Sequence, residues 1–270
     1  MRLLHTTNLR VQEFVDADIP SYAILSHTWG EEESGSFSKR KSFPKLQGAC
    51  QRAVQDSLEW IWIDTCTIDK TSSADLSEAI NSMYTYYAES KICYAHLADI
   101  DGNTIPYHYD TENYLKTSRW FTRGWTLQEL IAPRDLIFFD QKWVELERRW
   151  GLSRILTKIT GIPEKVLCGE SPFQCNVAQR MSWAANRVTT RKEDVAYCLM
   201  GLFEVSMPPL YGEGAEEAFL RLQEEILKRS ADQTIFLWTA AHEPLNSGLL
   251  ASSPQAFYSL SIPNSGCATR

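Results

Sequence analysis

Short apolar runs alternate with helical patterns over the first 140 residues. The runs lie at 22–26 (YAILS), 60–64 (WIWID), 91–97 (KICYAHL) and 136–139 (LIFF). Continuous apolar stretches of this length predict strands that are covered on both faces. The helical patterns between them lie at 45–58, from about Asp75 to Tyr87, and at about 117–131. Alternating strands and helices predict an α/β fold, with a parallel sheet flanked by helices.

The second half of the chain has a different pattern, in which helical periodicity dominates. Helices are expected at 150–159, 179–186, 193–203 and 216–229, and a strand at 234–238. The last residues are rich in Ser, Pro, Asn and Gly, which is typical of a surface segment. We therefore expect an α/β core over 1–145, a helical extension over 146–240 packed on that core, and a surface tail over 241–270.

Composition narrows the class of protein. Hydrophobic residues make up 44% and charged residues 23% of the 270-residue chain, as in ordinary globular proteins. The formal net charge of −7 argues against sequence-independent nucleic-acid binding, which requires a basic face. No apolar stretch is long enough for a membrane span. The seven cysteines form no CxxC pair, which indicates reduced thiols and a cytoplasmic protein.

Polar residues follow three of the predicted strands. In parallel α/β sheets, ligands bind at the carboxyl ends of the strands, near the point where the strand order reverses. The residues at these positions are Ser26, His27, Thr28, Trp29 and Gly30, then Asp64, Thr65, Cys66 and Asp69, then His96 and Asp99. If the strands are parallel, these side chains share one rim. Gly30 has two readings, a plain turn or a point where a ligand approaches the backbone.

The predicted helix at 117–131 carries one carboxylate, Glu129. Trp125 lies four residues earlier and therefore on the same helical face. A carboxylate beside an indole is partly desolvated, which raises its pKa and suits it to stabilising a developing positive charge. The composition also fits a plain alternative, a surface glutamate paired with Arg123 or Arg134.

Other chemistries have weaker support. Cys93 and His96 are three apart on a predicted strand, where that spacing turns them to opposite faces. A buried thiol and a hydrogen-bonded histidine are the simpler interpretation, so we expect no metal site. A hydrolase using Cys66 with His27 stays open, although nothing in the spacing singles the pair out. Neither the GxxxxGK[ST] nor the GxGxxG nucleotide signature is present.

Four blocks of the sequence resemble the fungal heterokaryon incompatibility (HET) domain. They are YAILSHTWG at 22–30, WIWIDTCTID at 60–69 with SEAINSMYTYY at 77–87, SRWFTRGWTLQELIAP at 118–133, and the segment 189–226. The resemblance spans roughly residues 20 to 240. It implies an effector of fungal non-self recognition whose activation triggers growth arrest or cell death. Such domains are often the N-terminal part of a larger protein with sensor or repeat regions.

The resemblance also implies a distant relation to the TIR domain, and hence a TIR-like, flavodoxin-like sheet. Ser118, Trp120, Glu129 and Leu130 are similar to a TIR pattern that precedes the fourth strand. In enzymatic TIR domains the glutamate of this pattern is catalytic in NAD cleavage, a role that falls here on Glu129. The loop after the first strand, SHTWGEEE, departs from the TIR pattern.

The expected reaction is hydrolysis of the nicotinamide–ribose bond of NAD, with NAD as substrate and no separate cofactor. Glu129 is the expected catalytic carboxylate. The expected substrate-binding residues are Ser26, His27, Trp29, Gly30, Asp64, Arg123 and Trp125. In geometric terms, Glu129, Trp125 and the loop 26–30 should line one pocket.

Two rival readings remain at this point. The first is a non-catalytic, TIR-like module that signals by self-association. The enzymatic interpretation also expects self-association on activation, and it expects a sensor protein or domain as a partner. The second is a Mg²⁺-dependent nucleotide-processing enzyme using Asp64, Asp69 and Glu129, which would require the three carboxylates to lie close together.

Overall fold

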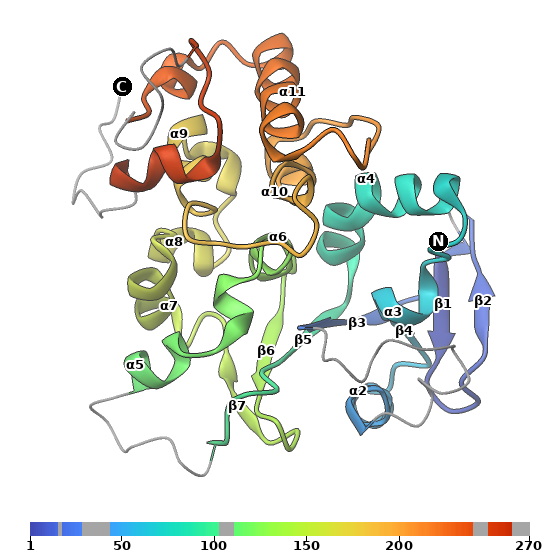
Figure 1. The fold of residues 1–270 in the computed structure, drawn as a ribbon. Helices are drawn as coiled ribbons and strands as arrows, with labels where there is room; N and C mark the ends of the chain where they lie inside the picture. The colour runs from blue at the N-terminus through green and yellow to red at the C-terminus, as the bar shows by residue number, and fades with distance from the viewer. Residues whose placement is uncertain (16–17, 29–43, 103–110, 240–247, 261–270) are drawn as a thin grey trace. The chain divides into compact units, whose positions relative to one another are not determined.

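The computed structural model describes residues 1–15, 18–28, 44–102, 111–239 and 248–260 (Figure 1). Contacts within the chain divide it into two units. The first comprises Met1–Trp120 and Ala132–Gly151, and the second comprises Phe121–Ile131 and Leu152–Arg270. The segment that carries Glu129 therefore belongs by its contacts to the second unit.

The first unit is built on a seven-stranded mixed sheet with the order β2-β1-β4-β3-β5-β6-β7. Its strands are β1 (Arg2–His5), β2 (Val11–Glu13), β3 (Tyr22–His27), β4 (Trp60–Trp62), β5 (Ile92–His96), β6 (Leu136–Phe139) and β7 (Glu145–Arg148). The four central strands β4, β3, β5 and β6 are parallel, and β1, β2 and β7 pair antiparallel at the edges. The α/β class is confirmed, and the expectation of a purely parallel sheet is corrected to a mixed one.

The order of the parallel strands defines where a ligand would bind. In chain order these strands are β3, β4, β5 and β6, so their spatial order is second, first, third, fourth, as in the first part of a flavodoxin-like sheet. The chain passes from β3 to β4 on one side of β3, and then from β4 to β5 on the other side of β3. The reversal therefore lies between β3 and β5, and the crevice beyond their carboxyl ends is the topological switch point.

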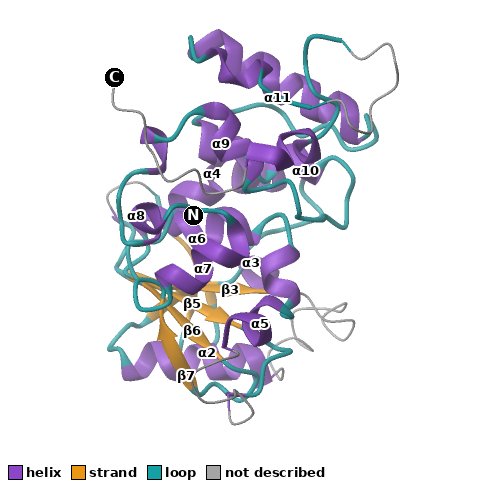
Figure 2. Ribbon diagram, turned by 90° about the vertical axis from the view of Figure 1, so that its left-hand side faces the viewer, coloured by secondary structure: helices purple, strands orange, loops and turns teal. Residues whose placement is uncertain are grey.

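Helices of the first unit pack on both faces of its sheet, with α2 and α4 on opposite sides (Figure 2), and neighbouring side chains along a strand point to opposite faces. One face carries Leu25 and Tyr94, which share a buried apolar cluster with residues of α2 (Pro44–Gln55). On the opposite face, Trp62 packs edge-to-face against Tyr87 of α4 (Ser73–Glu89), with ring centroids 5.9 Å apart. Ser72 caps α4 by accepting a hydrogen bond from the backbone N–H of Asp75. The remaining helices of this unit are α3 (Asp64–Thr67) and α5 (Thr111–Lys116).

The second unit is helical in its described part. Its elements are α6 (Thr126–Ile131), α7 (Ser153–Thr160), α8 (Glu164–Leu167), η5 (Pro172–Gln174), α9 (Val177–Ser182), α10 (Asp194–Tyr197), η6 (Met200–Phe203), α11 (Ala215–Arg229), η7 (Gln233–Phe236) and η8 (Pro254–Leu260). The strand expected at 234–238 is wrong, since a 3₁₀ turn lies there, capped by Asp232. Within the described residues, no helix combines the length and the apolar character that a membrane span requires.

The helix expected over 117–131 is broken in the middle. A 3₁₀ turn, η4 (Arg119–Thr122), is followed by α6, and Arg123 between them forms an isolated bridge with Val188. Gly124 explains the break, because a Cβ at this position would lie 2.5 Å from Cγ2 of Thr189. The backbone is held against the 188–189 segment and leaves the helical path.

Part of the expected surface tail is packed. Phe257 in η8 and Ala251 before it are fully buried. Gln223 of α11 donates to the carbonyl oxygen of Ala251 at 2.8 Å and accepts from its backbone N–H at 3.1 Å. Residues around 251–257 therefore complete the core of the second unit.

Candidate functional site

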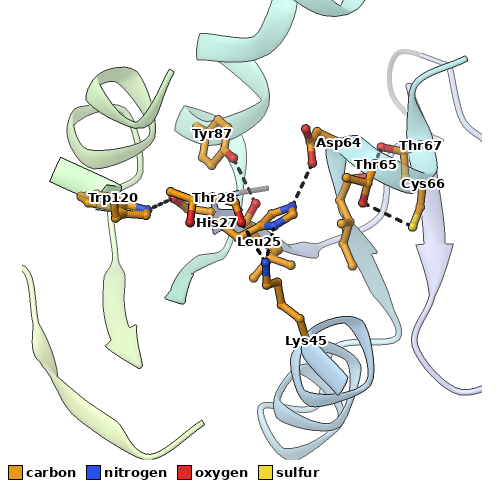
Figure 3. Close-up of polar contacts among 12 residues, drawn as sticks. Leu25, His27, Thr28, Lys45, Asp64, Thr65, Cys66, Thr67, Tyr87 and Trp120 are labelled. Atoms are coloured by element: carbon orange, nitrogen blue, oxygen red, sulfur yellow. Dashed lines mark hydrogen bonds and ion pairs between the residues drawn. The ribbon is translucent and has the colours of Figure 1, made fainter. Parts of the chain in front are cut away.

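His27 lies at the end of β3 and contacts residues of two other elements (Figure 3). Its Nε2 lies 3.1 Å from Oδ1 of Asp64, which begins α3 directly after β4. Its Nδ1 lies 3.4 Å from Nζ of Lys45, in the first turn of α2. Lys45 also donates to the carbonyl oxygen of Thr28 at 2.8 Å. Side chains from three elements thus meet at the carboxyl edge of the sheet.

These contacts determine the tautomer of His27. An ammonium group only donates hydrogen bonds, so Nδ1 accepts from Lys45. The ring proton therefore lies on Nε2 and is donated to Asp64. In this tautomer the imidazole of His27 is oriented by a carboxylate, the arrangement that many general bases adopt.

His96 lies beside His27, because the two residues are register partners across β3 and β5. Its side chain is 4% exposed and stacks on Trp143, with ring centroids 4.7 Å apart. Within the described part of the chain, neither ring nitrogen has a hydrogen-bond partner. Burial, and then the nearby Lys45 and His27, lower the pKa of His96 from 6.5 to about 4, so its imidazole is neutral at pH 7.

Ser26 faces the other side of the sheet from His27, because neighbouring strand residues alternate. Its hydroxyl accepts a hydrogen bond from the indole Nε1 of Trp120 at 2.8 Å, and both side chains are buried (Figure 3). Nearby, Tyr87 donates to the carbonyl oxygen of Leu25 at 3.0 Å. These bonds fasten the end of β3 to the elements that cover this face, so the Ser26 hydroxyl supports the fold.

Glu129 lies in α6, where all six residues are buried. Its exposed fraction is 6%, so the reading as a surface glutamate is wrong. The preceding residue, Gln128, is 2% exposed, and its Nε2 has no hydrogen-bond partner among the residues described. Two consecutive polar side chains are therefore buried on one short helix.

Arg187 provides the positive charge near Glu129. Its Nη1 donates to the carbonyl oxygen of Arg123 and to Oγ1 of Thr126, both at 2.8 Å. Burial lowers the pKa of Arg187 to about 10, although the Cys198 thiol and the Glu129 carboxylate oppose this shift. The guanidinium is still protonated at pH 7, so a buried positive charge lies near the Glu129 carboxylate.

Trp125, just before α6, is anchored through its indole nitrogen. Nε1 donates to Oδ2 of Asp194 at 3.0 Å, and the hydroxyl of Tyr211 donates to the other carboxylate oxygen at 3.0 Å. Burial raises the pKa of Asp194, while the two hydrogen bonds and the charge of Arg123 oppose this. Arg123 and Trp125 thus lie around one buried carboxylate, and their assignment to substrate binding stays a prediction.

The predicted site residues fall into three groups. Those of the first unit are Ser26, His27 and Asp64; those of the second unit are Arg123, Trp125 and Glu129; and Trp29 and Gly30 lie outside the described residues. The structure brings His27 and Asp64 into contact. The expectation that Glu129, Trp125 and the loop 26–30 line one pocket stays a prediction.

The arrangement gives little support to metal chemistry. Asp64 contacts His27, whereas Oδ1 of Asp69 accepts from the backbone N–H and the hydroxyl of Thr71, at 2.9 and 2.6 Å. The described residues contain no group of three or more His, Cys, Asp or Glu side chains that could hold a metal ion. Their six cysteines are free thiols.

Sequence reasoning placed His96 at the edge of the sheet but missed Lys45 and Arg187. The interpretation of His96 as a hydrogen-bonded histidine is wrong for the described part of the chain, since both ring nitrogens lack a well-formed hydrogen bond there. One sequence feature indicates a role for Lys45, because a cation in the first turn of a helix interacts unfavourably with the helix dipole. No sequence feature distinguishes Arg187 from other arginines, since its role depends on how the 187–189 segment packs against Arg123.

Comparisons with known proteins agree with the sequence blocks. A family model described as heterokaryon incompatibility protein (HET) matches residues 22–114, and a domain of unknown function (DUF8212) matches residues 217–262. The chain is 42% identical over 221 residues to the vegetative incompatibility protein HET-E-1 of Podospora anserina. This alignment covers 78% of the chain but only 16% of that protein. No solved structure gives a significant match.

Proposed function

This chain belongs to the heterokaryon incompatibility (HET) family, and we propose that it acts as an effector of fungal non-self recognition that causes cell death by hydrolysing NAD. The observation that carries the enzymatic part is Glu129, a buried carboxylate accompanied by the buried guanidinium of Arg187. Holding a charged carboxylate away from water is costly, and such groups are concentrated at functional sites.

In the proposed reaction, water attacks C1′ of the nicotinamide ribose and the bond from C1′ to the ring nitrogen breaks. The bonding electrons neutralise the pyridinium ring, and the products are nicotinamide, ADP-ribose and a proton. The transition state has oxocarbenium character, as in glycoside hydrolysis. Glu129 accepts hydrogen bonds from the ribose hydroxyls, and its negative charge stabilises the developing cation.

Arg187 has a positioning role in this proposal. It connects the start of α6 to Arg123 through the two hydrogen bonds of Nη1. Its charge also offsets part of the cost of burying the Glu129 carboxylate, because opposite charges attract strongly away from water. Two buried donors near this helix, Nε2 of Gln128 and Nη2 of Arg187, lack partners within the described residues and are available to a polar substrate.

The test is nicotinamide release from NAD by the purified protein, measured at high protein concentration so that assembly can occur. Wild type should release nicotinamide, and Glu129→Gln should lower the rate by at least about 100-fold, because the charge is lost while the shape is kept. Glu170→Gln is the matched control, since Glu170 is an exposed glutamate of the second unit. Activity that persists in Glu129→Gln would remove the catalytic assignment.

The second candidate is a signalling module that works by self-association without catalysis. Large apolar side chains on the surface favour it, among them Trp150, which is 62% exposed, and Leu227, which is 38% exposed. In this case Glu129→Gln would keep its toxicity in cells. Trp150→Ser or Leu227→Ser would lower both toxicity and the molecular mass measured by light scattering.

A further inference from the structure

Three observations point to the carboxyl ends of β3 and β5 as a site in their own right. This edge is the topological switch point of the parallel strands. His27 and His96 lie there as register partners, both on the face covered by α2. The two ring nitrogens of His96 are buried without a partner in the described part of the chain.

The orphaned nitrogens of His96 are the feature that requires an explanation. Leaving a buried donor or acceptor unsatisfied lowers stability, so a fold retains one chiefly where something else satisfies it. Trp143 covers one face of the ring, with ring centroids 4.7 Å apart. The backbone of Gln141 has a smaller, pKa-raising effect on the ring, but neither nitrogen has a well-formed hydrogen bond to the described residues.

The charges around His96 favour an anion. Lys45 from α2 and then His27 from β3 are the neighbours that most oppose protonation of His96, and the opposing effect of Asp140, which follows β6, is smaller. Asp64 lies at Nε2 of His27, whereas Lys45 lies at Nδ1. The imidazole of His27 thus lies between the carboxylate and the ammonium, and Lys45 contributes a positive potential at His96.

Helix α2 adds to this potential. It is 12 residues long, its first turn carries Lys45, and it has no acidic residue there. The partial positive charge at the start of a helix favours anions and disfavours cations. A lysine at this position costs stability in the absence of an anion and is a ready ligand in its presence.

We propose that Lys45 and His96, with His27 held in place by Asp64, form a binding site for a phosphate-bearing small molecule at the carboxyl ends of β3 and β5. Lys45 supplies the charge and the imidazole N–H of His96 donates to a phosphate oxygen. Asp64, which orients His27, has a side chain that is 22% exposed. It lies entirely within the first unit and does not depend on Glu129.

The test follows the ring resonances of His96 by NMR while inorganic phosphate, ADP or adenosine is added to the full chain at constant ionic strength. Phosphate and ADP should shift the His96 resonances and raise its pKa, because an adjacent anion favours the protonated ring. Adenosine, which lacks phosphate, should leave them unchanged. No probe contains nicotinamide, so the outcome is independent of NAD hydrolysis.

Single-residue variants test which side chains bind the phosphate. Lys45→Met should weaken phosphate binding at least about tenfold, and His96→Gln should remove the proton uptake that accompanies binding. Lys228→Met and His5→Gln are the matched controls, because Lys228 pairs with Glu225 in α11 of the second unit and His5 contacts Trp60 at the start of β4. Lys45 lies on the helix surface, so Lys45→Met serves even if His96→Gln fails to fold.

Two results would overturn the proposal. One is an unchanged His96 spectrum at millimolar phosphate and ADP, and the other is equal affinity in Lys45→Met and wild type. Failure here with intact NAD hydrolysis would remove this site alone. Phosphate binding without any nicotinamide release would remove the proposed hydrolysis and leave this site standing.

Discussion

At the scale of single residues, the most informative side chains are buried polar groups at the end of β3 and β5 and in α6. His96, Gln128 and Glu129 are each less than one-tenth exposed. The ring nitrogens of His96 and Nε2 of Gln128 lack a hydrogen-bond partner among the described residues, which lowers stability and points to a use of these two groups beyond the fold. They are also the residues at which a substitution separates stability from function.

The first prediction concerns the pH dependence of stability. His96 has a pKa of about 4 in the fold, against 6.5 for an exposed histidine. The unfolded chain therefore binds a proton between these values, and the stability from keeping His96 neutral is present above pH 6.5 and lost as the pH falls to about 4. The loss amounts to up to about 3 kcal/mol for this one group.

Urea unfolding at a series of pH values checks this prediction. His96→Gln should flatten the curve between pH 6.5 and 4 relative to wild type, and His5→Gln should not. A wild-type slope that His96→Gln leaves untouched would contradict it.

The second prediction concerns the hydrogen bond from Trp120 to Ser26. Ser26→Ala leaves the buried indole N–H without its 2.8 Å acceptor, which costs about 1–3 kcal/mol of unfolding free energy. Ser73→Ala, at an exposed position in α4, should stay within about 0.5 kcal/mol of wild type. Chemical denaturation of the two variants decides whether Ser26 has this structural role.

At the scale of secondary-structure elements, close packing between the β6–β7 turn and α2 fixes the segments around His96. Trp143 adopts a positive φ of 64° in the turn between β6 and β7, and Asp140 accepts the backbone N–H groups of Lys142 and Val144 there. This turn presents the indole to α2 beside His96. Gly48 is the residue that makes the contact possible.

The third prediction follows from that contact. A Cβ on Gly48 would lie 2.1 Å from Nε1 of Trp143, so Gly48→Ala must displace a large rigid ring. Alanine favours a helix by about 1 kcal/mol over glycine, yet overpacking of this kind costs roughly 1–3 kcal/mol. We expect a net loss of unfolding free energy, whereas Gln47→Ala on the exposed side should be neutral or stabilising. Thermal unfolding of both variants measures the difference.

Sequence patterns predicted the elements whose periodicity is strong. The strand at 136–139, the helices of α2, α4 and α11, and the capping serine of α4 follow from local spacing. The antiparallel strands β1, β2 and β7 have only three or four residues each, and β2 and β7 include exposed positions, so none of them contains an apolar run that stands out. The break at Gly124 depends on Thr189, 65 positions later, and no local pattern contains it.

The residues of the candidate site likewise divide into those that local sequence patterns predict and those that depend on distant contacts. His27 and Asp64 could be predicted because the parallel strand order brings strand ends together. Arg187 could not, since a buried guanidinium near Glu129 results from contacts between distant segments.

At the scale of the whole molecule, α6 lies between two segments of the sheet unit in the sequence but contacts the helical unit. All six of its residues are buried, and Arg187 fastens its start. The chain also spans about a sixth of the one curated relative to which it is compared, so the reaction of the longer protein is a matter for experiment.

The fourth prediction follows from this division. A fragment of residues 1–151 keeps all seven strands of the sheet but removes the partners of α6, and its apolar residues Leu127, Leu130 and Ile131 would be exposed. We expect this fragment to aggregate or to bind a hydrophobic dye, while residues 1–260 remain folded. A monomeric, cooperatively unfolding 1–151 fragment would contradict the division.

The central claim is that toxicity results from NAD hydrolysis at Glu129, and the most direct measurement is the time course of cellular NAD after induced expression. Wild type and Glu129→Gln are compared at equal protein levels, with Glu170→Gln as control. NAD should fall before growth stops with wild type and Glu170→Gln, and should stay constant with continued growth in Glu129→Gln. Growth arrest by Glu129→Gln with unchanged NAD would contradict the claim.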